Sequence, residues 1–348
     1  MQIKTKEMES VAKKGREYPH QFYLIAVCLL FWGIVASCSS AKDNPATDDE
    51  TCIRIGIAWR ADTTSTSFVS TVKAIREAGC EPVVLPMLKC PALEYDGDQL
   101  ATRHLDEHGI LLQEYADIIK RDTYKDVDIA AVVKGLDGLV FPGGEDICPT
   151  LFRIPQPLHG IESDPCDARR DVSDYMLMAW CLESDTLPVL CICRGMQLLS
   201  VVSGATMIQD LRTYFDEQGK TYNYLHREEP VEGKERDFAK HDVTVTDPTS
   251  LLRRIVATDV VRDVPSWHHQ AVLSVEGTPL KVTAITPTDG IDIIEAVERT
   301  DKRFIIGLQY HPEVAVLKHA NHVDGASNYM SYDEALCYFI ALKEQAKK

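Results

Sequence analysis

Cys193 stands where a short apolar run meets a helix-forming segment, in the sequence Leu187-Pro-Val-Leu-Cys-Ile-Cys-Arg-Gly-Met-Gln197. A strand that enters a tight turn and then a helix is typical of a nucleophile elbow, in which the turn lifts the side chain clear of the sheet edge. The positive end of the helix favours a thiolate, and Gly195 leaves room for the turn. We therefore expect Cys193 to be a nucleophile, although a strand end with two buried cysteines would give the same local pattern.

Cys191 is the other cysteine of this strand. Alternation along an extended chain places it on the same face as Cys193, but we expect only the turn residue to be raised. A disulfide between the two would close a very small, strained ring, so none is expected.

A candidate base lies near the carboxyl end of the chain, in Phe304-Ile-Ile-Gly-Leu-Gln-Tyr-His-Pro-Glu313. This run predicts a strand that ends in His-Pro-Glu. Residues two apart in an extended chain point the same way, and Pro312 stiffens the link. Glu313 would then hold the imidazole of His311, which takes the thiol proton and later delivers it to a leaving amine. An isolated His-x-Glu is more often a surface pair.

Attack of a thiolate on an amide carbonyl creates an oxyanion that needs backbone donors already in place. The N–H of Arg194, directly after the nucleophile, is one natural donor. Pro142-Gly143-Gly144 follows a predicted strand and has no side chains to keep the backbone away from a substrate. The second donor is expected from Gly143 or Gly144, and a plain sharp turn would explain the same glycines.

The elements that must position these residues alternate between strands and helices. Strands are predicted at 53–58, 82–86, 137–141 and 187–190, and helices at 68–78 and 171–183. This alternation indicates a mainly parallel sheet covered on both faces, in which ligands gather at the carboxyl ends of the strands. Two charged stretches suggest no chemical role: residues 90–128, which look helix-prone, and residues 226–242, which we interpret as a solvated excursion.

Composition limits the classes of partner. The chain has 348 residues, 45% of them hydrophobic and 26% charged, as is ordinary for a globular protein. A net charge of −16 argues against binding nucleic acid or anionic membrane surfaces. The 11 cysteines include no CxxC pair and no zinc-type spacing.

The amino terminus is typical of a targeting segment. A basic leader precedes the apolar run 22–35, which as a helix would span only about 21 Å, short of a bilayer core of about 30 Å. Val35-Ala-Ser-Cys38 resembles a bacterial lipobox, so we expect a signal peptide over residues 1–38, lipidation of Cys38, a flexible tether over 39–51 and a folded domain over 52–348. The protein would then be extracytoplasmic, either periplasmic or surface-exposed, and would meet the membrane only through its lipid. Ordinary cleavage nearby and an uncleaved anchor are the alternatives.

The two catalytic motifs carry a family resemblance. Cys-Ile-Cys193-Arg-Gly-Met-Gln197 resembles the Gly-Ile-Cys-Arg-Gly-x-Gln elbow of class I glutamine amidotransferases, with Cys191 in place of the leading glycine. Gly307-Leu-Gln-Tyr-His-Pro-Glu313 resembles their Gly-x-Gln-x-His-Pro-Glu signature. The resemblance is closest to the γ-glutamyl hydrolase branch (peptidase C26-like), which includes γ-glutamyl-γ-aminobutyrate hydrolases. It implies an α/β fold with a flavodoxin-like core: a doubly wound, mainly parallel central sheet with helices on both faces.

Three further motifs resemble the same branch. Residues 143–149 match its Gly-Gly-x-Asp-x-x-Pro loop, and Ser266-Trp-His-His-Gln270 matches its Asn-Ser-x-His-His-Gln stretch, with Pro265 replacing asparagine. Asp289-Gly290 followed by Ile294-Glu-Ala296 resembles its Asp-Gly-x-x-Glu-Ala hairpin with two extra residues. The resemblance spans roughly residues 53 to 342.

By this resemblance, four residues are candidates to bind the α-amino and α-carboxyl groups of a glutamyl unit: Gln197, His268, His269 and Gln270. The paired histidines also suggest a metal site, but no histidine or carboxylate stands near them at ligand spacing in the sequence, so neither metal nor cofactor is expected.

The function expected from the resemblance is hydrolysis of γ-glutamyl amide bonds in small compounds through a thioester on Cys193. A γ-glutamyl transpeptidase is one alternative, and an amidase directed at the γ-linked glutamate of peptidoglycan is another. A lipoprotein that only binds γ-glutamyl compounds is the non-enzymatic alternative. The sequence does not distinguish L- from D-glutamyl substrates, nor does it give the oligomeric state.

Overall fold

A computed structural model describes residues 52–121, 123–155, 166–233 and 236–348. The leader, Cys38 and the whole predicted tether lie outside these residues. Among the helices described, none combines the length and the apolar character needed to cross a membrane.

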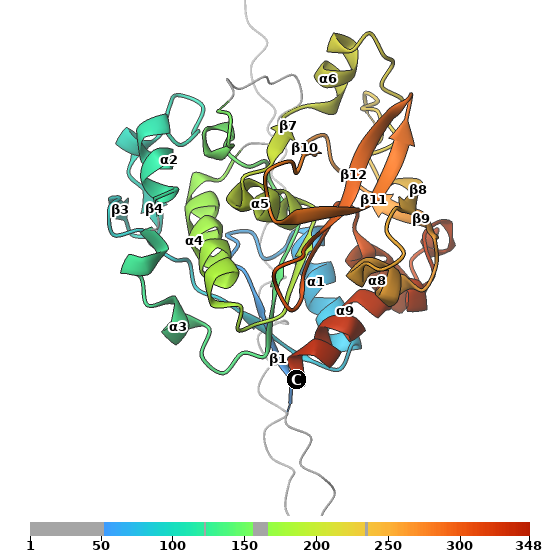
Figure 1. The fold of residues 1–348 in the computed structure, drawn as a ribbon, viewed down its shortest axis with the longest axis horizontal. Helices are drawn as coiled ribbons and strands as arrows, with labels where there is room; N and C mark the ends of the chain where they lie inside the picture. Colours follow the sequence, from blue (N-terminus) through green and yellow to red (C-terminus); the bar gives the residue numbers. More distant parts are fainter. Residues whose placement is uncertain (1–51, 122, 156–165, 234–235) are drawn as a thin grey trace, which may run out of the picture. The chain divides into compact units, whose positions relative to one another are not determined.

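Nine strands form one mixed sheet (Figure 1). Its spatial order is β2 (Glu81–Val84), β1 (Arg54–Ile57), β5 (Gly138–Phe141), β6 (Val189–Ile192), β13 (Ile305–Leu308), β12 (Ile291–Arg299), β11 (Leu280–Thr288), β8 (Ala239–Val245) and β9 (Val260–Ser266). The pairs from β2 to β13 are parallel, and those from β13 to β9 are antiparallel. The short strands β3 (Tyr95–Asp96) with β4 (Gln99–Leu100), and β7 (Thr206–Ile208) with β10 (Ala271–Ser274), form two separate ribbons.

Helices cover both faces of the parallel part of the sheet (Figure 1). One face carries α1 (Thr66–Glu77), α8 (Pro312–Ala320) and α9 (Tyr332–Ala346); the other carries α4 (Ala168–Ser184) and α5 (Arg194–Ser203). The other α-helices of the described residues are α2 (Gln113–Ile119), α3 (Ile129–Val132), α6 (Leu211–Glu217) and α7 (Leu251–Val256). The predicted doubly wound α/β fold is confirmed, and the antiparallel half of the sheet is an extension of it.

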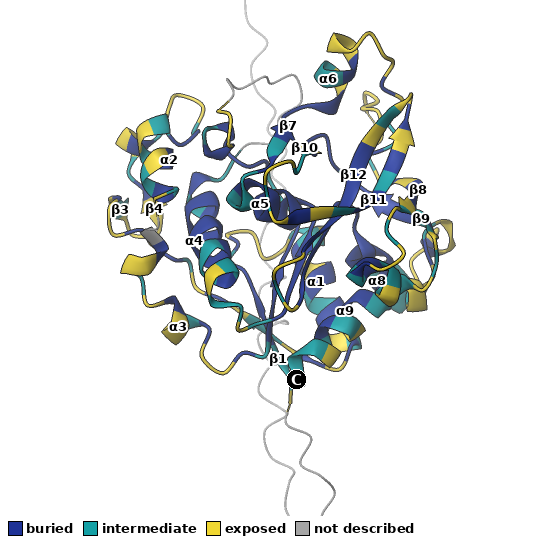
Figure 2. Cartoon of the chain, viewed as in Figure 1, coloured by how far each residue is buried: buried dark blue, intermediate teal, exposed yellow. Residues whose placement is uncertain are grey.

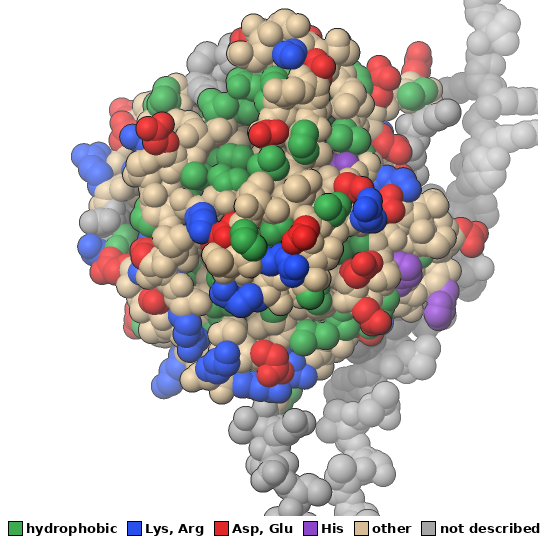
Figure 3. All heavy atoms as spheres, turned by 45° about the vertical axis from the view of Figure 1, so that its right-hand side comes forward, with side chains coloured by type: hydrophobic (Ala, Val, Ile, Leu, Met, Phe, Trp, Pro, Cys, Tyr) green, Lys and Arg blue, Asp and Glu red, His purple; other side chains and the backbone are tan. Residues whose placement is uncertain are grey.

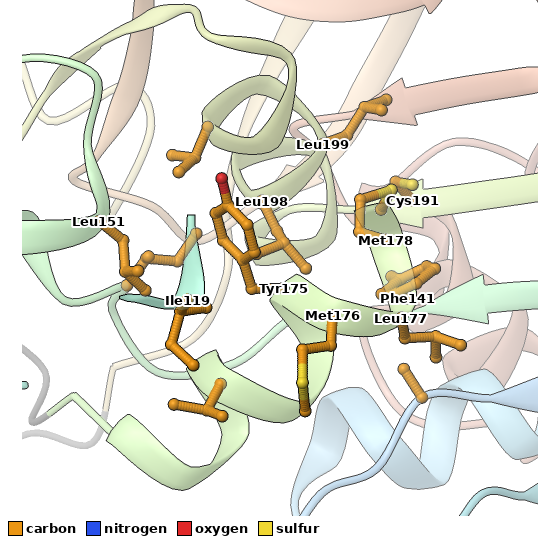
Figure 4. Packing of buried hydrophobic residues seen from close by; sticks show 14 of the residues in the cluster. Ile119, Phe141, Leu151, Tyr175, Met176, Leu177, Met178, Cys191, Leu198 and Leu199 are labelled. Carbon is orange, nitrogen blue, oxygen red and sulfur yellow. The ribbon is translucent and has the colours of Figure 1, made fainter. Parts of the chain in front are cut away.

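Alternation along the central strands divides the core into two layers. Leu139, Val189 and Cys191 face the α4–α5 side, whereas Leu190 and Ile192 face the helices α1, α8 and α9. Figure 4 shows Cys191 close to Phe141, Met178 and Leu199 on the α4–α5 side. In Figure 2 the central strands are dark blue, because they are buried on both faces.

The interpretation of residues 226–242 as a solvated excursion is wrong at both ends of the stretch, although residues 228–233 are exposed. Their amino-terminal end, His226, is fully buried, and their carboxyl-terminal end forms β8, in which buried and exposed residues alternate. The high charge of the stretch belongs to the residues between these two ends and to the outward face of β8. Acidic and basic side chains are also interspersed over the surface seen in Figure 3, as expected for a solvated face.

Gly195 lies where α5 crosses β5 most closely. A Cβ atom added there would stand 2.2 Å from the carbonyl oxygen of Phe141, a backbone atom that no side-chain rotation can move away. Glycine at this position therefore sets the distance between the helix after Cys193 and the neighbouring strand.

We expect Gly195→Ala to lower the free energy of unfolding by about 3 kcal/mol or more, because the helix must move off the sheet. Gly219→Ala is the matched control: it adds the same methyl group with nothing within 4 Å, at a φ of +65°. Its expected cost is about 1 kcal/mol. Urea titrations measure both values, and equal costs would contradict the tight contact.

Candidate active site

Cys193 forms the turn between β6 and α5. Its backbone has φ 50° and ψ −107°, a conformation that non-glycine residues adopt only under strain. Its N–H donates to the carbonyl of Leu308 on β13 at 2.6 Å, and the next residue, Arg194, begins α5. The turn reverses the alternation of the strand, so Cys193 contacts the α1–α8–α9 core and Cys191 the opposite one. The two cysteines therefore do not share a face.

His311 follows β13, the strand next to β6, and occupies the N-cap position of α8 without a capping hydrogen bond from its side chain. Its Nδ1 lies 2.7 Å from Oε1 of Glu313. The sequence predicts an extended link between His311 and Glu313, but the link is helical. Pro312 is the first residue of α8, and Glu313 lies in its first turn. Proline fits this position because its missing N–H would have no partner there.

The imidazole of His311 and the thiol of Cys193 lie on the same side of the sheet. A Cβ atom added to Gly143 would be 2.8 Å from Cε1 of His311 and 3.5 Å from Cβ of Cys193, so both residues lie beside this glycine. Burial alone would lower the pKa of His311, but Cys193 and Glu313 raise it to about 10. A protonated imidazole is the partner that stabilises a cysteine thiolate.

Other groups complete the surroundings of the sulfur atom. Gln309 Nε2 lies 3.5 Å from Sγ, and the carbonyl oxygen of Trp267 lies 3.8 Å from it. The ring of Phe238 packs edge-on against His311, with centroids 5.2 Å apart, and also contacts the indole of Trp267. Two aromatic rings thus lie beside the catalytic pair.

The Gly143-Gly144 turn after β5 is held by two arginines. Arg170 donates to the carbonyls of Pro142 and Gly143 at 2.9 and 3.1 Å, and Arg60 donates to that of Gly143 at 2.8 Å. Gly144 has a φ of +155°, and a Cβ atom there would stand 1.9 Å from a nitrogen of Arg170. The second glycine of the turn is therefore required by both its backbone and its neighbour.

The two arginines belong to a buried ion network. Glu145 bridges them, with Oε1 2.6 Å from Arg60 and Oε2 2.7 Å from Arg170. Arg194, the residue after the nucleophile, pairs with Asp171 and Asp174 of α4, and Asp174 also contacts Arg170.

Four members of this network have no role that the sequence predicts: Arg60, Arg170, Asp171 and Asp174. Nothing in their spacing indicates burial. The only available signal was the run of charge at the start of the predicted helix 171–183, which is a usual feature of exposed helix ends.

A cavity of about 650 Å³ opens beside the catalytic pair. Cys193 and His311 form part of its wall, as do Phe238 and Trp267. The polar part of the wall consists of Arg60, Ser65, Thr66, Ser67, Gly144, Glu145 and Arg236. Ser65 to Ser67 form the amino terminus of α1, where unpaired N–H groups give a partial positive charge.

The four residues expected to bind a glutamyl head group are buried and do not line this cavity. Gln197 Nε2 donates to the carbonyl of Gln270 at 3.0 Å and lies 3.3 Å from Oε1 of Gln309. His268 and His269 are both turned towards carboxylates inside the protein. The structure therefore brings together Cys193, His311, Glu313, Gly143 and Gly144. The four predicted glutamyl-binding residues are buried next to this site and do not reach the cavity.

His269 joins two loops near the site. Its Nε2 lies 3.0 Å from Asp146, in the loop after β5, and its Nδ1 lies 3.2 Å from Asp210, which caps α6. Burial alone would lower the pKa of His269, but the two carboxylates raise it to about 9.

The raised pKa of His269 predicts a pH-dependent stability. Because the folded-state pKa lies above the unfolded value of 6.5, the stabilisation is fully present below pH 6.5 and is lost as the pH rises through about 9. We expect a loss of roughly 3 kcal/mol over this window that is absent in His269→Gln. Chemical denaturation at pH 6 to 10 measures it. His108→Gln, at an exposed histidine, should keep the wild-type dependence of stability on pH. The same dependence in His269→Gln would contradict a stabilising role for the contacts of His269 with Asp146 and Asp210.

Comparisons with known proteins agree with the motifs. The sequence profile of the Peptidase C26 family matches residues 118–313. Protein NtpR of Enterococcus hirae is 33% identical over 186 residues, which cover 53% of this chain and 70% of that protein. The γ-glutamyl-γ-aminobutyrate hydrolase PuuD of Escherichia coli is 32% identical over 180 residues, which cover 51% of this chain and 64% of that protein.

A crystal structure of a glutamine amidotransferase from Thermotoga maritima aligns with a TM-score of 0.45 at 13% identity, covering 85% of this chain and 99% of that one. The family match extends from α2 to Glu313 and so includes both the elbow and the His-Pro-Glu motif. The family predicted from these motifs is confirmed: the chain belongs to the Peptidase C26 family, within the glutamine amidotransferase-like hydrolases.

Proposed function

We propose that this protein hydrolyses γ-glutamyl amide bonds through a thioester on Cys193. The observation that carries the proposal is the placement of Cys193 and His311 together on the wall of one cavity, with Glu313 2.7 Å from the far nitrogen of the imidazole. This is the order of nucleophile, base and orienting carboxylate that covalent acyl transfer needs.

The proposed reaction has two halves. His311 Nε2, which is buried without a hydrogen-bond partner among the described residues, holds the thiol proton as an imidazolium while the thiolate sulfur of Cys193 attacks the γ-carbonyl carbon. The C–N bond breaks as His311 returns the proton to the leaving amine. Water then attacks the thioester, with His311 as base, and releases glutamate and the thiol. Glu313 keeps the imidazole in the tautomer that presents Nε2 to the sulfur.

Backbone N–H groups are the proposed oxyanion donors. Arg194 is the first residue of α5, so its N–H has no partner within the helix. In a trans peptide the N–H points away from the preceding carbonyl. Because the carbonyls of Pro142 and Gly143 are turned towards Arg170 and Arg60, the N–H groups of Gly143 and Gly144 point the other way. Gly144 also lines the cavity, which makes it the preferred second donor.

The charges on the cavity wall suit an amino-acid head group. Arg60, Arg236 and the amino end of α1 offer sites for an α-carboxylate, and the partly exposed Glu145 offers one for an α-ammonium group. Phe238 and Trp267 leave an apolar side for the leaving amine. We propose these residues, in place of Gln197, His268, His269 and Gln270, as the direct contacts of a small γ-glutamyl substrate.

We also propose that the protein is held outside the cytoplasm by a lipid anchor. A lipid on Cys38 would tether the hydrolase outside the cytoplasm, where peptides and amino-acid conjugates from outside the cell are available.

We expect a fatty-acid analogue to label the wild-type chain in bacterial cells and not the Cys38→Ala variant. Cys52→Ala, which removes the exposed cysteine at the start of the described domain, is the control and should keep the label. Equal labelling of Cys38→Ala would remove the anchor from the proposal.

The triad makes a graded prediction. Cys193→Ser and His311→Ala should each lower kcat by at least about a thousandfold, whereas Glu313→Gln should cost less because the imidazole remains in place. Cys191→Ala is the matched control: that thiol is buried on the opposite side of the sheet, and its pKa is raised well above the usual range by burial. A loss in Cys191→Ala as large as that in Cys193→Ser would contradict the choice of nucleophile.

Substrate class is tested by incubating the purified protein with γ-glutamyl-p-nitroanilide, with small γ-glutamyl amides, and with muropeptides that contain γ-linked D-glutamate. Release of amine from the first two, without transfer to an added acceptor amine, is expected. Cleavage of muropeptides alone would favour a cell-wall amidase, and product formed only with an acceptor would favour a transpeptidase. Turnover of none of them, with Cys193 still alkylated by iodoacetamide, would contradict the hydrolase.

A further inference from the structure

A second cluster of reactive side chains lies behind the catalytic wall. His226, His241 of β8, His268 after β9 and Glu295 of β12 each point one ligand atom towards a common centre, and these atoms all lie within 4.8 Å of one another. All four side chains are at most 1% exposed. The proposed hydrolysis uses none of them.

The inward atoms of this His226–His241–His268–Glu295 cluster lack hydrogen bonds. His226 Nδ1, His241 Nε2, His268 Nε2 and both carboxylate oxygens of Glu295 are buried with no hydrogen-bond partner among the described residues. Oε1 lies 3.0 Å from His226 Nδ1, but without hydrogen-bond geometry, and 3.7 to 3.8 Å from the other two nitrogens. Five such atoms left unpaired in the interior would destabilise the fold, because each loses its hydrogen bonds to water and gains none in return.

The outward ring nitrogens, in contrast, all have partners. His268 Nδ1 lies 2.9 Å from the carbonyl of Gln270, which can only accept, so this nitrogen carries the proton. The hydroxyl of Thr286 donates to the carbonyl of Asp242, so it accepts from His241 Nδ1 at 3.1 Å.

The third ring follows the same rule. The hydroxyl of Thr288 donates to the carbonyl of Thr286 and accepts from His226 Nε2 at 3.0 Å. In all three histidines the proton therefore lies on the outer nitrogen, and the inner nitrogen presents a lone pair.

Three lone pairs that face one carboxylate need a cation between them. A single shared proton would satisfy one nitrogen and leave the other two unpaired. Outer hydrogen bonds from ligating imidazoles to hydroxyl or carbonyl oxygens are the usual second layer of a metal site.

We infer that this cluster is a four-ligand site for a transition-metal dication, Zn²⁺ by preference, bound through three imidazole nitrogens and one carboxylate oxygen. Three nitrogens and one oxygen with no further position for substrate make a closed site, as in structural zinc centres. Bonds of about 2.0–2.1 Å imply ligand separations of roughly 3.3–3.4 Å, so the site closes by small movements from the present spacing.

The metal would position the active-site wall. Ser266 Oγ and His268 N both donate to the carbonyl of His226, so the ligands also interlock through the backbone. Between them lies Trp267, whose carbonyl is 3.8 Å from the sulfur of Cys193. His311 N donates to the carbonyl of Pro265 at 2.8 Å. Residues 265–268 thus connect the cluster to both catalytic residues.

Metal content tests the inference directly. The full-length chain, purified in detergent after growth with Zn, Mn, Fe, Co, Ni and Cu salts and washed with a weak chelator, should hold roughly one equivalent of one dication by elemental mass spectrometry. His241→Gln and Glu295→Gln should lower this at least tenfold. His108→Gln, at an exposed histidine outside the cluster, should not. Cys193→Ser should also keep the metal, which separates this site from adventitious binding at the nucleophile and from any failure of the proposed hydrolysis.

The wild-type chain supplies a second measurement that does not depend on the folding of variants. Removal of the metal by a strong chelator should lower the thermal midpoint, and added Zn²⁺ should restore it. Co²⁺ should give the intense visible absorption of a four-coordinate ion. Hydrogen exchange should rise more in residues 265–270 than in β5. Less than a tenth of an equivalent of every metal offered, with no shift in the midpoint, would overturn the inference, as would equal metal content in the cluster variants and His108→Gln.

Discussion

The left-handed backbone of Cys193 is the constraint on which the site depends. A non-glycine residue at φ 50° costs on the order of 1–3 kcal/mol, so the surroundings must hold it there. The hydrogen bond from its N–H to Leu308 joins the turn to β13, and Gly195 lets α5 pack directly on Phe141. The same turn separates the two cysteines of β6: one is sealed in the α4–α5 core, and the other lies at the cavity.

A second requirement follows from burying a turn beside the nucleophile. The carbonyls of Pro142 and Gly143 need donors, and the guanidinium groups of Arg170 and Arg60 supply several in fixed geometry. Buried ion pairs are weak evidence for stability, because desolvation offsets most of the attraction. Their value here is orientation: they hold both carbonyls of the turn on the side of the arginines, which leaves the N–H groups of Gly143 and Gly144 on the opposite side.

Local patterns predicted the fold class, the strand–turn–helix around Cys193 and the pairing of His311 with Glu313. Each depends on residues close together in the sequence or on alternation of strands and helices. The buried arginine network was not predictable, because Arg170 and Asp174 lie on a helix whose charges look solvated until the helix is packed. The ends of the stretch 226–242 were not predictable for the same reason. Its high overall charge gives no sign that buried and exposed residues alternate in β8, where His241 points inward. The glutamyl contacts were assigned by resemblance, and the side-chain directions of Gln197 and His268 do not lead to the cavity.

The adjacent residues His268 and His269 connect different elements of the fold near the active site. The side chains of His268 and His269 face different carboxylates, so they do not contact one common group. His269 reaches Asp146 and Asp210 and joins the loop after β5 to α6. His268 reaches Glu295 and joins the end of β9 to β12. Trp267, the residue before them, contacts the sulfur through its carbonyl. The motif therefore connects the antiparallel extension of the sheet to its parallel core. An ion bound by His226, His241, His268 and Glu295 would also fix the distance between the catalytic pair and the aromatic side of the cavity.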